Sequence, residues 1–184
     1  MLSLHIHFFD LALLEWYNIH WKEYNYYING DSMEIYIEKA KYNDTLEVDK
    51  LLTELIQDER KYDDNINKNY VVKDFYNKFV DKSNSCIAVA KTKDKEIVGY
   101  CFAFVENCEN VYNEKIVQLD ALFVKATYRG KGIGQKLIKY ITKWSKEKGA
   151  KYIELKVCND NENAIKLYDK CEFKQSKRIL LKPL

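Results

Sequence analysis

A chain of 184 residues with 47% hydrophobic residues is long enough to bury the core of one domain, and a single proline with six glycines argues against disorder. A formal net charge of +2 does not indicate a nucleic-acid or membrane partner, and no apolar run reaches the roughly 20 residues that span a bilayer. Five cysteines without a Cys-x-x-Cys pair give no sign of a disulfide framework or zinc site and, with no basic segment at the N-terminus, predict a cytoplasmic protein.

The first part of the chain, residues 1–32, is rich in aromatic side chains and is predicted to be a helical or irregular N-terminal extension. It contains the three histidines of the chain, His5, His7 and His20, but no carboxylate or cysteine joins them at ligand spacing. No metal site is therefore expected. The extension is a candidate for packing on the domain or for joining two copies in a homodimer, and residues 33–184 are predicted to form the domain itself.

The first elements of the domain are predicted to be a strand that begins at Met33 and a helix that begins near Asp44. Asp44 and Glu47, three residues apart, form a candidate capping box for that helix. A second helix is expected over residues 72–80. Residues 42–64 carry eight acidic and three basic side chains, which indicates either a solvated helix face or a surface that attracts a cation.

The second half of the chain is predicted to alternate strands with helices. The strands are expected at residues 86–91, 96–105, 115–124, 152–157 and 173–181. The helices are expected at residues 132–147 and 162–170. A regular apolar stripe marks the inner face of the first of these helices: Ile133, Leu137, Ile138, Ile141 and Trp144. Because that helix joins two strands, they are expected to be parallel neighbours in the mixed sheet of an α/β fold.

A glycine-rich loop lies between the strand that ends at Val124 and the helix that follows. Its residues are Arg129, Gly130, Lys131, Gly132, Ile133 and Gly134. Glycine has no Cβ, so several backbone N–H groups can approach a ligand, and the unpaired N–H groups of the helix N-terminus point the same way. Such a loop binds phosphate. A P-loop and a dinucleotide fingerprint are both excluded, because Gln135 and Lys136 stand where those motifs need other residues.

The same loop resembles the acetyl-coenzyme A signature Arg/Gln-x-x-Gly-x-Gly/Ala of the GNAT superfamily of N-acetyltransferases. A second segment, from Asn161 to Phe173, is similar to the Asn-x-x-Ala-x-x-x-Tyr-x-x-x-Gly-Phe segment of that family, at the usual distance downstream. Glu172 departs from the pattern, because it stands where the family has the glycine that ends the helix in a left-handed residue. The resemblance implies the GNAT fold, a six- to seven-stranded mixed sheet flanked by helices, over about residues 33–182.

The resemblance also implies an activity, the transfer of an acetyl group from acetyl-coenzyme A directly to a primary amine without a covalent enzyme intermediate. In that family the strand end at Leu122, Phe123 and Val124 binds the pantetheine arm. The N–H group of Leu122 is then expected to polarise the thioester carbonyl. The pyrophosphate is expected on the backbone amides of residues 129–134, with Asn161 holding the coenzyme from the other side.

Two side chains are candidates for proton transfer. Tyr168 lies where the family has its general acid, which protonates the departing thiolate; the alternative is a half-buried aromatic, since the chain has fifteen tyrosines. The acceptor must also lose a proton, because an alkylamine with a pKa of about 10 is an ammonium ion at neutral pH. Gln118 and Asp120 share one face of the predicted strand, and only Asp120 can act as a base. Asp120 could instead cap a loop or orient a water.

The acidic balance of residues 42–64 favours a small cationic amine as acceptor, because carboxylates concentrate cations. A protein or peptide amine is the alternative acceptor, and a non-catalytic sensor of acyl-coenzyme A is the alternative function. Residues 125–151 carry nine basic side chains and one acidic side chain, most of which are expected on a solvated helix face. Arg129 and Lys131 lie in the loop itself and are expected to contact phosphate.

Overall fold

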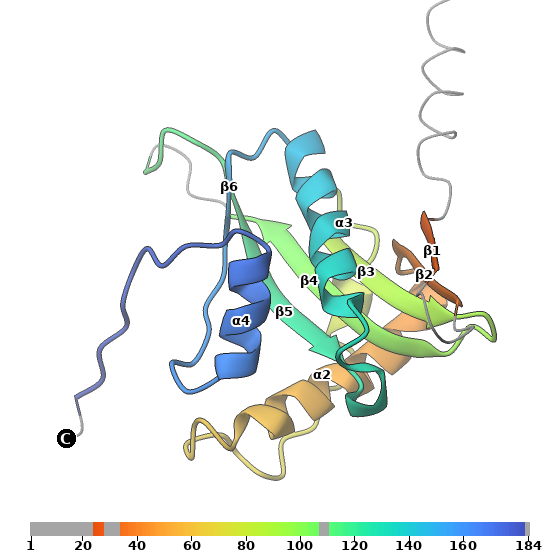
Figure 1. The fold of residues 1–184 in the computed structure, drawn as a ribbon, viewed down its shortest axis with the longest axis horizontal. Coiled ribbons are helices and arrows are strands. Elements are labelled where there is room, and N and C mark those ends of the chain that lie inside the picture. Colours follow the sequence, from red (N-terminus) through yellow and green to blue (C-terminus); the bar gives the residue numbers. More distant parts are fainter. Residues whose placement is uncertain (1–23, 28–33, 107–110, 183–184) are drawn as a thin grey trace, which may run out of the picture.

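The computed structural model describes residues 24–27, 34–106 and 111–182, which form a six-stranded sheet with helices on both faces (Figure 1). The strands follow chain order across the sheet: β1 (Tyr24–Tyr27), β2 (Glu34–Lys39), β3 (Ser85–Thr92), β4 (Ile97–Val105), β5 (Ile116–Val124) and β6 (Tyr152–Glu154). Neighbours are antiparallel except β5 and β6, which are parallel as predicted. The mixed sheet and the strands of the central hairpin are therefore confirmed.

Strand β1 was not expected, because it lies in the stretch that was predicted to be helical or irregular. It pairs antiparallel with β2, with Tyr24 opposite Ile37. The boundary between an extension and a domain at residues 32 and 33 stays a prediction. The three histidines of the extension lie outside the described residues.

The helices divide between the two faces of the sheet, with α3 on one face and α2 on the other (Figure 1). The described helices are η1 (Tyr42–Asp44), α2 (Thr45–Glu59), η2 (Tyr76–Lys78), η3 (Ala126–Tyr128), α3 (Ile133–Glu147) and α4 (Glu162–Lys170), where η marks a 3-10 turn. Helix α4 packs beside α3 through Leu167. None of these described helices is long and apolar enough to cross a bilayer.

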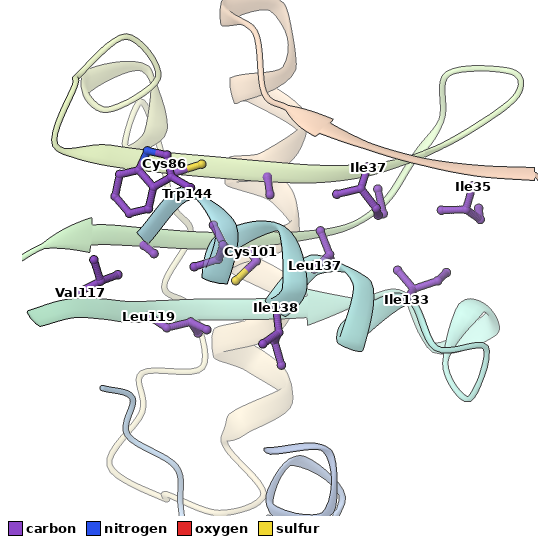
Figure 2. Close-up of a cluster of buried hydrophobic side chains, with 14 of the residues drawn as sticks. Ile35, Ile37, Cys86, Cys101, Val117, Leu119, Ile133, Leu137, Ile138 and Trp144 are labelled. Carbon is purple, nitrogen blue, oxygen red and sulfur yellow. The ribbon is translucent and has the colours of Figure 1, made fainter. Parts of the chain in front are cut away.

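The predicted inner stripe of α3 forms the core on its face of the sheet. All five of its residues are at most 5% exposed: Ile133, Leu137, Ile138, Ile141 and Trp144. They pack on apolar side chains of β2 to β5, and Figure 2 shows Trp144 beside Cys86 at one end and Ile133 at the other. Burial of such side chains contributes about 1.5–3 kcal/mol each, which fixes α3 and the loop before it on the sheet.

The predicted helix over residues 72–80 is wrong, because only the short turn η2 forms there. Asp74 has a left-handed backbone with φ of 51°, which an α-helix cannot contain. The carboxylate of Asp49 on α2 accepts the N–H groups of Phe75 and Tyr76 at 3.1 and 3.0 Å, and so holds the segment in an irregular path. Tyr76 is nevertheless fully buried against α2.

The predicted capping box of α2 is also wrong. The carboxylate of Asp44 accepts the backbone N–H of Lys41 at 2.8 Å and binds the ammonium group of Lys91, so it makes no cap bond to α2. The preceding residues form the turn η1 instead. Helix α2 still begins next to Asp44, at Thr45.

The C-terminal part of the sheet is smaller than predicted. Strand β6 covers only Tyr152–Glu154, and Tyr152 is 58% exposed, so the predicted buried strand over residues 152–157 is shorter and more exposed than expected. The predicted strand over residues 173–181 is wrong, since that segment forms no strand. It is attached to the edge of the sheet by an ion pair between Lys177 and Glu154 at 2.9 Å.

Candidate active site

The candidate site begins at an edge of β5 that β6 leaves open. Strand β6 pairs with β5 only through Ile116, Val117 and Gln118. From Leu119 to Val124, β5 continues along β4 on one side, and no described strand pairs with its other side. Backbone N–H and C=O groups on this side can therefore bind an extended ligand as a further strand would.

A β-bulge at Asp120 changes the direction of β5 in the middle of this edge. Phe102 of β4 lies opposite Ala121, and the next residue of β4 lies opposite Leu119, so Asp120 is an extra residue. Before the bulge the side chain of Leu119 packs on the α3 side, and after it Phe123 packs on the α2 side. The bulge thus exchanges the two faces of the strand at the site.

The backbone direction after the bulge puts the N–H group of Leu122 on the open edge. The N–H of Lys125 donates to the carbonyl of Val98 on β4 at 2.9 Å. Successive N–H groups of a strand point to opposite edges, so Leu122, three residues earlier, presents its N–H away from β4. The carbonyl of Val124 lies on the same open side, where it accepts a bond from Arg129 Nε at 2.8 Å.

The glycine loop lies at the end of the open edge. Gly130 and Gly132 both have left-handed backbones, with φ of 78° and 75°. A Cβ added at Gly130 would meet no atom within 4 Å, so the space in front of the loop is open to a ligand. The N–H groups of the first turn of α3, which starts at Ile133, have no carbonyl partner within the helix. The loop therefore fits a pyrophosphate.

The third glycine of the loop has a different part in the structure. A Cβ added at Gly134 would come within 3.0 Å of Leu167 Cδ2 on α4. A side chain here would require Leu167 to shift, so Gly134 allows α4 to pack closely on the start of α3. The sequence pattern alone does not separate this packing role from phosphate binding.

The two basic residues of the loop lie against neighbouring protein groups. Arg129 contacts the carboxylate of Asp58 at the end of α2, with Nη2 at 3.2 Å from Oδ2, and its Cζ lies 5.4 Å from the centre of the Phe123 ring. Lys131 Nζ lies 5.7 Å from the centre of the Tyr128 ring. Contact of these two charges with phosphate stays a prediction.

Tyr168 lies on α4, and the end of that helix holds its ring. The ring packs edge-to-face on Phe173, with centroids 5.7 Å apart. The N–H of Phe173 donates to the carbonyl of Tyr168, and the N–H of Glu172 donates to that of Asp169, both at 3.0 Å, which is a Schellman motif. Glu172 itself takes the left-handed conformation, with φ of 67°. The helix therefore ends as the family pattern implies, without the glycine.

The hydroxyl of Tyr168 is held in its protonated form. Burial raises the pKa of Tyr168, and the nearby Cys101 and Glu59 add to the effect. At neutral pH the group is a proton donor. Burial also raises the pKa of the Cys86 thiol to about 12, which makes that cysteine a poor nucleophile.

Two carboxylates of the site come from opposite parts of the chain, Glu59 at the end of α2 and Asp120 at the bulge. Burial raises the pKa of Glu59, and the neighbouring carboxylates of Asp58, Asp120 and Asp63 raise it further. Asp120 has considerable exposed surface, yet the protein atoms crowded around its carboxyl raise its pKa, while the ammonium group of Lys156 opposes this. Each group therefore gives up its proton at a higher pH than an ordinary carboxyl group.

Asn161 is the N-cap residue of α4. Its side-chain oxygen accepts the N–H of Ala164 at 3.2 Å, so it caps the helix, and it lies 3.3 Å from the hydroxyl of Tyr62. The latter contact joins the segment after α2 to α4 across 99 residues of sequence. Contact of Asn161 with the coenzyme stays a prediction.

A family model described as the acetyltransferase (GNAT) family matches residues 49–173. The chain belongs to the GNAT family. The matched stretch includes most of α2, the open edge of β5, the glycine loop and α4. The resemblance read from the two sequence segments is therefore confirmed.

Curated relatives match shorter stretches. An uncharacterized N-acetyltransferase of Methanocaldococcus jannaschii is 28% identical over 82 residues, which are 45% of this chain and 36% of the relative. A thialysine N-epsilon-acetyltransferase of Bos taurus is 32% identical over 72 residues, which are 39% of this chain and 41% of that enzyme. The matches thus span less than half of the length of these relatives.

Solved structures share the fold over most of the chain. A tetramutant of the BH1408 protein from Bacillus halodurans is 25% identical, with a TM-score of 0.71, over 80% of this chain and 99% of that one. The aminoglycoside N-acetyltransferase AAC(6')-Iy in complex with CoA is 14% identical, with a TM-score of 0.64, over 84% of this chain and 97% of that one. The second likeness shows the fold alone.

The structure adds Tyr62 to the site, which sequence reasoning did not place there, and it separates Asp58 and Glu59, which the acidic run of residues 42–64 had grouped together. Tyr62 and Asp58 contact Asn161 and Arg129 from the α2 side, and Glu59 lies near both Tyr168 and Asp120. The acidic run of residues 42–64 was the only signal for these carboxylates. It did not tell which of them faces the open edge.

Proposed function

We propose that this GNAT protein is an acetyl-coenzyme A-dependent N-acetyltransferase that acetylates the primary amine of a small cationic molecule. One observation carries the proposal: the open edge of β5 leads from the Leu122 N–H to the glycine loop at Gly130, with Tyr168 held beside it. A thioester donor with a long pantetheine arm and a pyrophosphate matches each part of this arrangement in order.

Leu122 and Tyr168 have separate roles in the proposed acyl transfer. The amine nitrogen forms a bond to the acetyl carbon, the bond from that carbon to sulfur breaks, and the electron pair leaves on sulfur. The Leu122 N–H donates to the carbonyl oxygen as negative charge develops there. Tyr168, which its raised pKa keeps protonated, gives its proton to the departing thiolate, and the proton that the acetylated nitrogen then loses restores the hydroxyl.

The base must remove a proton from an ammonium ion, which costs about 4 kcal/mol at neutral pH for an amine of pKa about 10. We propose Asp120 for this step, directly or through water, because the bulge places it at the site on the α2 side. Glu59 is the second carboxylate near that position. The negative charge of Glu59 attracts a cation to this position. The acceptor is therefore bound as an ammonium ion before it reacts.

The acceptor pocket is proposed to select cations through Glu59, Asp63 and Asp120. Asp58 is engaged elsewhere, by Lys61 at 2.9 Å and by Arg129. The thialysine acetyltransferase among the curated relatives supports a small amine as acceptor. The cytoplasmic location, the lack of a metal and the homodimer stay predictions.

A coenzyme-release assay against a panel of amines tests this function. The panel contains a diamine, a polyamine, an aminoglycoside, a neutral-chain monoamine and a peptide with a free N-terminus. Release of free thiol with a cationic small amine is the expected result. Turnover with the peptide alone would show that the acceptor is a protein or peptide amine. Tight binding of acetyl-coenzyme A without any turnover would indicate a sensor.

A further inference from the structure

Two adjacent carboxylates at the end of α2 are directed to different partners. Asp58 contacts Arg129 of the glycine loop and Lys61 of the following turn, whereas Glu59 is influenced by Asp120 and other carboxylates. Adjacent residues of a helix do not share a face, so the two side chains diverge. The helix end therefore meets both the coenzyme side and the acceptor side of the site.

Arg129 is held at three points. Its Nε donates to the carbonyl of Val124 at 2.8 Å, its Nη2 lies 3.2 Å from Asp58 Oδ2, and its Cζ lies 5.4 Å from the centre of the Phe123 ring. Two of these anchors belong to the end of β5, and the third belongs to α2. Among these three contacts, only the one with Asp58 uses a side-chain oxygen of the partner residue.

The geometry leaves the guanidinium group able to bind a further anion. A guanidinium has five N–H donors in a planar fork, and the bonds to Val124 and Asp58 use two of them. The Arg129 side chain is 46% exposed and belongs to the residue directly before Gly130, so its remaining donors are available to a ligand of the loop. A phosphate oxygen at the loop can therefore bind Arg129 without breaking either bond.

We infer that Asp58 is a positioning residue for coenzyme binding, which acts through Arg129 on the pyrophosphate. The inference rests on the proposed function, because it needs a pyrophosphate at the loop. The inference predicts that loss of the Asp58 charge weakens coenzyme binding, although simple electrostatics predicts the opposite. Removing a negative charge near a binding site for an anion should by itself strengthen binding. Loss of the contact that orders Arg129 should weaken binding instead.

The test is the Kd of acetyl-coenzyme A by calorimetry for the full chain and four variants: Asp58→Asn, Arg129→Ala, the double variant, and Asp64→Asn. Asp64 is an exposed carboxylate close in sequence and serves as the matched control for charge. We expect Asp58→Asn to raise Kd about two- to fivefold, the range that an exposed ion pair provides. Asp64→Asn should leave Kd unchanged or slightly lower, and Asp58→Asn should have no effect when Arg129 is already alanine.

Steady-state kinetics add a second readout that a merely structural role would not give. Asp58→Asn is expected to raise KM for acetyl-coenzyme A and to leave KM for the amine unchanged. A Kd that is unchanged or lower in Asp58→Asn, or an effect that persists without Arg129, overturns the inference while wild-type binding still supports the function. No binding of acetyl-coenzyme A to the wild-type chain overturns both.

Discussion

Replacing Tyr168 by phenylalanine removes one hydroxyl and little else. The ring keeps its contact with Phe173, and the backbone bonds of the Schellman motif do not involve the hydroxyl. Helix α4 and the open edge of β5 should therefore stay as they are. The substitution isolates the transfer of a proton to the leaving thiolate, which is the step proposed for this group.

The size of the expected effect follows from the leaving group. General acids contribute about 10²–10⁴ in rate. A thiol has a pKa of about 8.5, so its thiolate is a weak base that leaves with less help than an alkoxide would. Tyr168 is also only partly buried, so water can replace part of its role. We expect kcat to fall about ten- to a thousandfold, or about 1.4–4 kcal/mol in activation free energy.

Single-turnover measurements with saturating acetyl-coenzyme A give the rate of the chemical step directly. The Kd of acetyl-coenzyme A should change little, because the hydroxyl is not needed to bind it. Tyr152→Phe on β6 is the control, since that side chain is 58% exposed. If Tyr168→Phe kept the wild-type rate when chemistry limits turnover, Tyr168 would not be the general acid.

Four further outcomes are expected. Gly132→Asp brings a negative charge to the loop and should raise the Kd of acetyl-coenzyme A at least about tenfold. The control is Gly149→Asp, past the other end of α3, which should not change this Kd although Gly149 is equally left-handed, with φ of 71°. Glu172→Gly should relieve a left-handed residue and stabilise the fold by about 0.5–1 kcal/mol, or about 1–4 °C in Tm, with activity retained; a lower Tm would show that the glutamate is not strained. KM for a diamine should lie below that for a neutral-chain monoamine and rise with salt and with Glu59→Gln, and equal, salt-insensitive KM values would show that the acids are a solvated face. Glu59→Gln should also raise Tm at neutral pH, because the raised pKa of Glu59 means that its charge destabilises the fold; this gain should vanish as the pH falls below about 4.3, where the group is protonated in both states, and a gain that persists at low pH would contradict the cause.

Features set by local periodicity were predictable from the sequence. The stripe from Ile133 to Trp144 repeats at helical spacing over about three turns, so its helix and its buried face followed directly. The glycine loop and the segment around Tyr168 were found because each is a short, continuous pattern. No long-range contact is needed to read them.

Features set by contacts between distant residues were not predictable. Asp49 captures the N–H groups of Phe75 and Tyr76, 26 and 27 residues away, and the apolar spacing of residues 72–80 gives no sign of it. Asp44 had the right residue type for a cap, but it forms an ion pair with Lys91 of β3 instead. The sequence shows which residues can form such bonds, but it does not show which partner each of them binds.

The extra residue at Asp120 makes the length of β5 as important as its composition. Before it, odd-numbered side chains face α3, and after it, even-numbered ones do. If residue 120 paired with β4 as an ordinary strand residue, this change of side would not occur, so Phe123 would face the other core and the Leu122 N–H would join the ladder with β4. The open edge at Leu122 therefore depends on how the backbone pairs at residue 120, and not on which side chain stands there.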